Sequence, residues 1–293
     1  MVRSSRLVGS RLTAAAIVLL VAWPVAAQTP VSLSDNKYTP AQDVRIGRQA
    51  AEEIEQQLPL LRDRSVTSYV ASLGRRLVSA IPPDLRQPDF RYTFKVINVR
   101  DLNAFALPGG PIYVNRGMIE VARNEGELAG VLAHELSHVV LRHGTAQATR
   151  ATPYQLGALA GAVAGAIIGG NAGAVVSQGT QFGLGTMFLR YSRRFEREAD
   201  VLGAQIMARA GYDPRHAANM FRTLEHMNGS GGPEFLSSHP NPGNRYESIT
   251  REAELLRVRH PVGDTAEFRR VKTRLARTGP APTTAQVMGS RRR

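Results

Sequence analysis

The sequence predicts an α+β fold that is mostly helical and contains one small sheet. Two observations predict this class. Apolar residues recur at helical spacing in several long segments, whereas only two short segments have the pattern of strands, at about residues 90–98 and 111–115. The chain has 293 residues, of which 43% are hydrophobic, so it can bury one sizeable core.

The N-terminal segment, residues 1–27, has the composition of a secretory signal peptide. Arginines precede the apolar run LTAAAIVLLVAW, and the small residues Val25 and Ala27 stand at the two positions that a signal peptidase reads. We therefore expect export to the periplasm or cell envelope, with cleavage after Ala27. An uncleaved membrane anchor is the alternative, although the apolar run is short for a membrane span.

The net charge and the cysteine count limit the partners and the metal ligands that the chain can have. The net charge is +13, but no nucleic-acid motif or aromatic-interleaved basic patch is present, so we expect no nucleic-acid partner and favour attraction to an anionic membrane surface or simple solubility. The chain has no cysteine. Disulfides and a lipid anchor at the cleavage site are therefore excluded, and any metal site must use His, Asp or Glu.

Apolar periodicity predicts where the helices and strands lie, and residues such as Pro and Gly predict where they end. Residues 40–61 are charged and amphipathic, residues 66–80 carry an inward apolar stripe that ends at PPD, and ALPGGPIYVN reads as a turn into a short strand. Asn124 marks the start of the next helix and Gly144 its end. The helices are expected at about 40–61, 66–80, 124–143, 193–210, 214–228 and 244–258.

Two segments stand apart from this pattern. Between Arg150 and Arg190 no residue is charged, and glycines recur every fourth position, which predicts an uncharged glycine-rich insertion at 150–190. It is either a flexible or tightly packed insertion or a hairpin that faces membrane or substrate, and its apolar part is short for a bilayer span. Residues 259–293 are expected to form a basic, largely disordered tail with room for one short helix.

The sequence VLAHELSHVVLRHG carries the candidate chemistry. Residues four apart on a helix lie about 40° apart around its axis, so His134 and His138 project from one face and can bind one zinc ion. Glu135 lies beside that face, where it can act as a general base on a water without being a ligand. A metal is the simplest partner for two buried histidines on one face beside a carboxylate, and two core histidines satisfied by ordinary hydrogen bonds are the alternative.

The third ligand must come from another segment. His143 lies about 180° from His134 on a continuous helix, so it is expected to point away. In YSRRFEREADVLG, Glu196 and Asp200 share one flank of a helix, whereas Glu198 is expected to face solvent. We predict Glu196 as the ligand, with Glu198 as the alternative. Asp200 is expected to accept the N–H group of a liganding histidine, or else to form an ordinary surface pair.

These motifs resemble the zinc metallopeptidase family of the CAAX prenyl protease, HtpX and Oma (peptidase family M48). The resemblance covers HELSHVVLRHG, YSRRFEREADVLG, NAFALPGGPIYVNRGMI and SSHPNPGNR, and it is greatest to the periplasmic BepA-like branch, without that branch's C-terminal helical repeats. It implies a zincin-type (gluzincin) domain over 28–258, with a small sheet beside the zinc helix. It also implies that His239 gates the metal or contacts substrate, and that Arg245 stabilises an oxyanion or orients peptide.

The sequence therefore predicts a zinc metalloendopeptidase with one Zn²⁺ ion per chain, which hydrolyses misfolded or envelope proteins in quality control near a membrane. Protein or peptide substrates and association with a membrane surface are the expected partners. The alternative is a periplasmic chaperone-like binding protein whose zinc is gated or structural. An intramembrane protease would require the 150–190 segment to span the bilayer.

Overall fold

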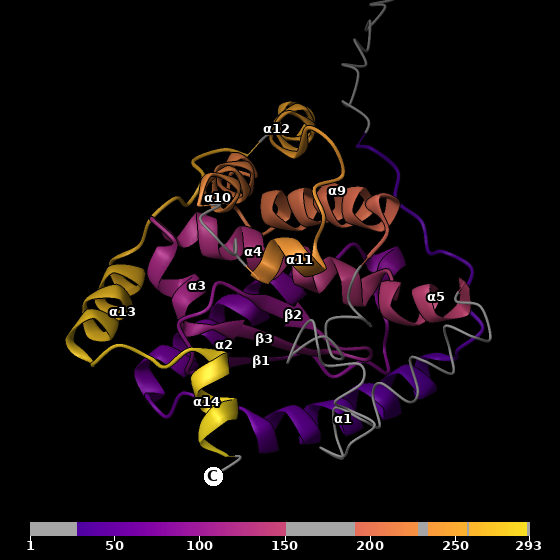
Figure 1. Ribbon diagram of the computed structural model, residues 1–293. Helices are drawn as coiled ribbons and strands as arrows, with labels where there is room; N and C mark the ends of the chain where they lie inside the picture. Colours follow the sequence, from indigo (N-terminus) through magenta and orange to yellow (C-terminus); the bar gives the residue numbers. More distant parts are fainter. Residues whose placement is uncertain (1–27, 151–190, 228–233, 257, 292–293) are drawn as a thin grey trace, which may run out of the picture.

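A small sheet packed among helices organises the chain (Figure 1). The computed structural model describes residues 28–150, 191–227, 234–256 and 258–291. The predicted signal peptide and nearly all of the predicted glycine-rich insertion lie outside the described residues. Within the described ranges the fold is mostly helical with one three-stranded sheet, so the predicted fold class is confirmed.

The sheet has the strand order β1-β3-β2. Strand β1 (Thr93–Ile97) runs parallel to β3 (Pro111–Asn115), and β2 (Ala104–Ala106) runs antiparallel to β3. Strands β1 and β3 form where alternation predicts them. The edge strand β2 has three residues, all of them buried, so it shows no alternation and escapes sequence analysis.

The two faces of the sheet belong to different parts of the core. Ile112 and Val114 on β3 point into the large core shared with the helices above the sheet in Figure 1. Tyr113, between them, points to the opposite face, stacks on Phe105 with ring centroids 5.1 Å apart, and donates a hydrogen bond of 2.6 Å to Glu55. This alternation places an apolar layer on each side of the strands.

The helices differ in how well the sequence predicts them. The long amphipathic helices form within a few residues of the predicted bounds, whereas the shorter α3, α5, α11 and α14 have too few turns to show a period. The helices, with one short 3-10 turn η1, are α1 (Pro40–Gln57), α2 (Arg64–Ser79), η1 (Pro83–Leu85), α3 (Arg116–Val121), α4 (Glu125–Val140), α5 (His143–Arg150), α9 (Arg193–Arg209), α10 (Arg215–His226), α11 (Glu234–Ser238), α12 (Arg245–Leu255), α13 (Ala266–Arg277) and α14 (Thr284–Ser290).

Helix α4 is the central element, and all its residues are buried. It packs on α9, α10, α2 and the strands β2 and β3. Its approach to α10 is close: a Cβ atom added at Gly130 would come within 2.7 Å of the Ala217 backbone. A helix covered on all sides must satisfy its polar side chains within the protein, which makes its histidines and glutamates the focus of the fold.

Helix α4 ends earlier than predicted. Its C-cap is Leu141 rather than a residue near the predicted end at about 143, and Arg142 takes a left-handed conformation with φ of 57°, so a separate helix, α5, begins at His143. Two contacts hold this break. Arg142 Nε donates to the buried Asp43 carboxylate over 2.6 Å, and Arg142 Nη2 donates to the Tyr38 carbonyl over 2.5 Å. Helix α1 therefore fixes the end of α4.

The C-terminal tail differs from the prediction of a largely disordered segment. Helix α13 forms at the predicted short helix and buries Phe268, Val271 and Leu275 against α2 and α3. Beyond it, α14 has a Thr283–Gln286 capping box, and the Thr284 N–H group donates to Asp101 over 2.5 Å. The apolar stripe of α13 supplies enough buried surface to order a segment that its basic composition alone would leave unfolded.

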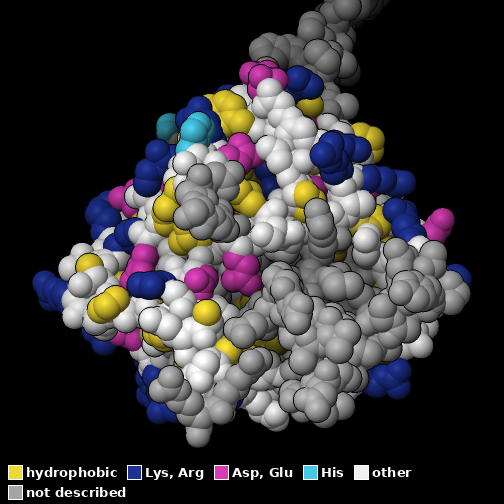
Figure 2. Space-filling view, viewed as in Figure 1, with side chains coloured by type: hydrophobic (Ala, Val, Ile, Leu, Met, Phe, Trp, Pro, Cys, Tyr) yellow, Lys and Arg dark blue, Asp and Glu magenta, His cyan; other side chains and the backbone are white. Residues whose placement is uncertain are grey.

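Two features of the described residues concern the predicted interactions with membranes and nucleic acids: the apolar character of the helices and the distribution of surface charge. Among the helices of the described ranges, none combines the length and apolar character needed to cross a bilayer. On the face shown in Figure 2, outside the grey atoms, Lys and Arg side chains are scattered around the rim with acidic side chains between them. This face therefore shows no continuous basic patch.

Candidate metal centre

Helix α4 presents the two histidines of the motif side by side. Asn124 caps the helix, since its side chain accepts from the Glu127 N–H group over 3.0 Å. One turn separates His134 from His138, and their Nε2 atoms lie 3.1 Å apart. Both side chains are fully buried. The predicted pairing of these two histidines on one helix face is what the structure contains.

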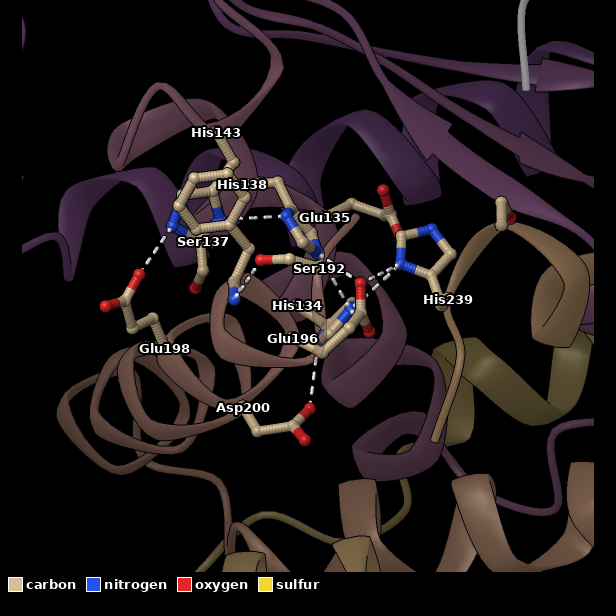
Figure 3. A network of polar contacts seen from close by, with 12 residues as sticks. His134, Glu135, Ser137, His138, His143, Ser192, Glu196, Glu198, Asp200 and His239 are labelled. Atoms are coloured by element: carbon tan, nitrogen blue, oxygen red, sulfur yellow. Dashed lines mark hydrogen bonds and ion pairs between the residues drawn. The ribbon is translucent and has the colours of Figure 1, made fainter. Parts of the chain in front are cut away.

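Two further side chains complete a cluster (Figure 3). Glu196 comes from the first turn of α9, and His239 comes from the segment after α11. One ligand atom from each of His134, His138, Glu196 and His239 lies within 4.8 Å of all the others, and all four residues are buried. The structure thus brings together the three predicted ligands and adds His239 at the same point.

The donor set fits a small tetrahedral cation. Bonds of about 2.0–2.1 Å from zinc to nitrogen and oxygen imply ligand atoms about 3.3–3.4 Å apart. Here each His Nε2 atom of α4 lies 3.4 Å from a Glu196 oxygen, and His239 Nδ1 lies 3.2 Å from His134 Nε2 and 3.1 Å from Glu196. Two neighbouring imidazole nitrogens and a carboxylate at these distances form a site that a divalent metal would satisfy.

Glu135 lies beside the cluster without belonging to it. Its carboxylate is buried, and neither oxygen has a hydrogen-bond partner among the described residues. His239 Nε2 lies 3.3 Å away, off the hydrogen-bond axis. Burial raises the pKa of Glu135 to about 7. A carboxyl group with free oxygens and a pKa near neutrality can take up and release a proton.

Asp200 and Arg245 support the His134 side of the cluster. Asp200 Oδ1 lies 3.0 Å from His134 Nδ1. Arg245 Nη2 donates to Asp200 and to Glu196 over 2.8 Å each, while its guanidinium lies over the ring of Phe221 at 4.1 Å from the centroid. All three charged groups are buried. Asp200 therefore lies beside the His134 ring nitrogen that is turned away from the cluster, and Arg245 lies next to the cluster.

His143 and Glu198 do not lie where the sequence predicts. Because α4 breaks at Arg142, His143 turns back toward the site, and its Nδ1 atom lies 2.9 Å from His138 Nδ1. Glu198 does not face solvent: its carboxylate lies 3.3 Å from His143 Nε2, and its side chain is only 19% exposed. Neither residue belongs to the four-residue cluster. The helical wheel fails for His143 because it assumes an unbroken helix, whereas Glu198 lies on the predicted face of α9 but packs against His143 there.

The electrostatics of the cluster follow from burial and mutual contact. Burial lowers the pKa of His138 well below its usual value, so its imidazole is neutral. Burial alone would raise the pKa of Glu196, but the neighbouring His239, His134 and His138 hold it well below its usual range. For His138 and Glu196 these are the protonation states, neutral imidazole and ionised carboxylate, that a metal ligand needs.

Aromatic residues that sequence analysis missed hold the rings in place. Tyr191 stacks on His138 with centroids 3.8 Å apart and an interplanar angle of 12°, and Phe235 stacks on His239 at 4.4 Å and 17°. The N–H group of His239 also donates to the Phe235 carbonyl over 2.8 Å. Tyr191 directly precedes Ser192, the N-cap of α9. Its place next to the start of a helix is the one feature of the sequence that could have drawn attention to Tyr191.

Comparison with known proteins agrees with this geometry. The profile of Peptidase family M48 matches residues 65–253, which contain all the residues of the cluster. The chain is 30% identical over 239 residues to the beta-barrel assembly-enhancing protease of Yersinia pestis, a match that covers 80% of this chain and 48% of the relative. It is 30% identical over 221 residues to the Escherichia coli K12 protein of the same name, covering 74% and 45% respectively.

A relative of a second kind gives the same result. The mitochondrial metalloendopeptidase OMA1 of Schizosaccharomyces pombe is 29% identical over 202 residues, which covers 68% of this chain and 56% of the relative. The chain thus spans about half the length of the curated relatives that it matches.

Proposed function

The chain belongs to peptidase family M48, and from that premise we propose that it is a zinc-dependent endopeptidase that cleaves misfolded or envelope proteins. The observation that carries this proposal is the buried cluster of His134, His138 and Glu196 beside Glu135, whose two oxygens accept no hydrogen bond from the described residues. A structural zinc site would need no such carboxylate beside it. The chemistry of the site is therefore hydrolysis.

The residues divide the work as follows. His134, His138 and Glu196 hold the zinc, which when bound supplies a Lewis acid that polarises a carbonyl and lowers the pKa of water. Glu135 accepts a proton from the attacking water at its carboxylate and returns it to the leaving amine. Asp200 holds the Nδ1–H group of His134, so that its Nε2 lone pair faces the cluster.

Arg245 is proposed to stabilise negative charge on the substrate. Two of its guanidinium nitrogens contact Asp200 and Glu196, but the third, Nη1, is buried and has no hydrogen-bond partner within the described ranges. A buried donor without a partner is costly unless a ligand completes it. An oxyanion or a peptide carbonyl would do so.

His239 is proposed to act as a gate. Its Nδ1 atom stands at the fourth corner of the cluster, where a catalytic zinc site normally keeps an open position. His239 must therefore leave before a substrate carbonyl can approach. This arrangement supports the second candidate function, a chaperone-like binding protein in which the gate stays closed and binding of unfolded protein is the activity.

The proposed location is the bacterial periplasm or cell envelope, near the membrane surface. The composition of residues 1–27 supports export, and the printed names of the Y. pestis and E. coli relatives connect them with β-barrel assembly. Misfolded envelope proteins are accordingly the proposed substrates.

The test is a cleavage assay on casein and on an unfolded envelope protein. We compare the wild type, Glu135→Gln and wild type treated with chelator. Cleavage by the wild type alone supports the proposal, because Gln keeps the shape of Glu135 but cannot accept the proton. Equal cleavage by Glu135→Gln contradicts the mechanism. If no sample cleaves and all bind the unfolded protein, the chaperone-like function replaces the peptidase.

A further inference from the structure

A second set of polar contacts runs from the metal cluster toward the surface. His138 Nδ1, on the side of the ring away from the cluster, lies 2.9 Å from His143 Nδ1. The other nitrogen of His143, Nε2, lies 3.3 Å from the Glu198 carboxylate. Glu198 in turn accepts from Arg194 Nε over 2.8 Å. Figure 3 shows this chain on the opposite side of the cluster from His239.

The contacts of His138 and His143 determine which ring nitrogen of each histidine carries the hydrogen. Two ring nitrogens in contact need one hydrogen between them, so either His138 or His143 donates. If His143 donated from Nδ1 as a neutral ring, its Nε2 would carry a bare lone pair facing a carboxylate, and His138 would place an N–H group at the cluster. If His138 donates, every group has a suitable partner, and the lone pair of His138 Nε2 faces the cluster.

We infer that His143 and Glu198 are positioning residues that fix the tautomer of His138 so that its Nε2 atom can bind the metal. This inference rests on the proposed zinc site. It adds two residues that act through a ligand and touch neither the metal nor the substrate. The ionised Glu198 faces His143 Nε2–H across an ion-pair contact of 3.3 Å that is not an aligned hydrogen bond, and His143 Nδ1 accepts from His138 Nδ1–H.

The surroundings of His143 are built for this orientation. The residue is fully buried, and its ring stacks on Phe195 with centroids 4.3 Å apart and planes at 14°. The break at Arg142 turns it toward His138, and the Asp43 carboxylate holds that break in place. A histidine that served only as packing would not require its two nitrogens to meet a metal ligand on one side and a carboxylate on the other.

Helix α9 thus supplies three carboxylates with three tasks. Glu196 faces the cluster, Asp200 contacts His134 directly, and Glu198 reaches His138 through His143. The spacing allows this because Glu196 and Asp200 lie one turn apart, while Glu198 lies between them on a different face of the helix. Each ligand histidine therefore has its own carboxylate on the same helix.

The first test measures zinc affinity in the full-length protein by competition with a chelator. His143→Leu removes the acceptor for His138 and should weaken zinc binding about 10- to 100-fold, as the loss of such a partner usually does. His143→Asn keeps an acceptor oxygen close to the position of Nδ1 and should stay within about threefold of wild type by the same argument. His226→Leu, on the exposed part of α10, is the matched control and should bind like wild type.

The outcomes separate this inference from the proposed function. A wild type that binds no zinc overturns the proposed function and this inference with it. A wild type that binds zinc, together with a His143→Leu variant within about twofold of it, overturns the inference alone. The inference also falls if His143→Asn loses as much affinity as His143→Leu, because the acceptor would then not matter.

A second measurement needs no variant and so does not depend on folding of a mutant. Long-range ¹H–¹⁵N correlation spectra of the zinc-loaded, ¹⁵N-histidine-labelled protein distinguish protonated from unprotonated ring nitrogens. We expect His143 to carry its hydrogen on Nε2 and to leave Nδ1 unprotonated. A spectrum with the hydrogen of His143 on Nδ1 overturns the inference, because His143 would then donate to His138.

Discussion

The two histidines of α4 are chemically identical but are supported in different ways. His134 contacts the carboxylate of Asp200 directly, and Arg245 braces that carboxylate in a completely buried pair. His138 reaches Glu198 only through His143, and the brace there is Arg194, whose side chain is 58% exposed. The comparison shows that one side of the site has a short and fully buried support, whereas the other has a longer series of contacts that ends at the surface.

The largest effect is expected from breaking the buried support. Asp200→Ala removes the carboxylate beside His134 and, among the described residues, leaves Arg245 in an ion pair with Glu196 alone. Removing one member of a buried ion pair costs about 3–5 kcal/mol, so the free energy of unfolding should fall by about that amount. Chemical denaturation monitored by circular dichroism measures it. A loss below about 1 kcal/mol would show that the pair is not essential to the fold.

The next effect concerns the break that turns His143 toward His138. Arg142→Ala leaves the buried Asp43 carboxylate without this ion pair, which should cost about 3 kcal/mol, and the alanine keeps the left-handed strain that Arg142 already bears. Arg142→Gly loses the same ion pair but tolerates the positive φ, so it should be about 1 kcal/mol more stable than Arg142→Ala. Equal stability of the two variants would mean that the backbone relaxes out of this conformation.

Glu135 belongs to neither support, and its buried carboxyl group predicts a pH dependence. Its folded pKa of about 7 lies above the ordinary value of 4.5. The folded state therefore binds more protons between these values, so this contribution to stability is complete below pH 4.5 and is lost as the pH rises through 7.

The check compares zinc-free wild type with zinc-free Glu135→Gln over that range. The wild type should lose about 2–3 kcal/mol relative to the variant, which has no titrating group at this position. Thermal unfolding at a series of pH values gives the difference. A constant difference from pH 4.5 to 7 would show that the pKa of Glu135 is not raised.

A smaller effect is expected from neutralising the outer carboxylate. Glu198→Gln should weaken zinc binding by about threefold, whereas the matched change Asp200→Asn should weaken it by about 10- to 100-fold. The difference follows because Glu198 is partly exposed and its contact with His143 is off-axis, so that water can replace it. Isothermal titration with a zinc–chelator buffer measures both. Equal losses would remove the distinction between the two supports.

The smallest effect belongs to the surface brace. Arg194→Ala removes an exposed i, i+4 pair with Glu198, and such pairs contribute about 0.3–0.5 kcal/mol. We expect less than about a twofold change in zinc affinity and a shift in the free energy of unfolding of about 0.5 kcal/mol or less. A tenfold loss of zinc affinity would show that Arg194 holds Glu198 in place.

The parts of the site that sequence analysis could predict are those that depend on one helix at a time. His134 and His138 at four-residue spacing, and Glu196 with Asp200 on one flank of α9, follow from helical geometry. The wheel also placed Glu198 on a different face from Glu196. The predicted faces of α9 are therefore correct. Which residues pack against each face depends on the tertiary structure, which the helical period does not predict.

The remainder depends on the end of α4 and on segments distant in sequence. The position of His143 follows from the left-handed Arg142, which is fixed by Asp43 nearly one hundred residues earlier in the chain, and no local pattern shows that contact. Helix α14 and strand β2 are too short for a period. The position of His239 within the cluster could be anticipated only from the family resemblance, since its Pro- and Ser-rich surroundings predict an exposed loop.

The most direct test of the account is the zinc content of two neighbouring variants of α9. The wild type, Glu196→Ala and Glu198→Ala are purified and dialysed without added metal. Inductively coupled plasma mass spectrometry then gives the number of zinc ions per chain in each. We predict about one zinc ion in wild type and in Glu198→Ala, and almost none in Glu196→Ala, because only Glu196 faces the cluster. Full zinc in Glu196→Ala, or its loss in Glu198→Ala alone, would contradict the proposed metal site.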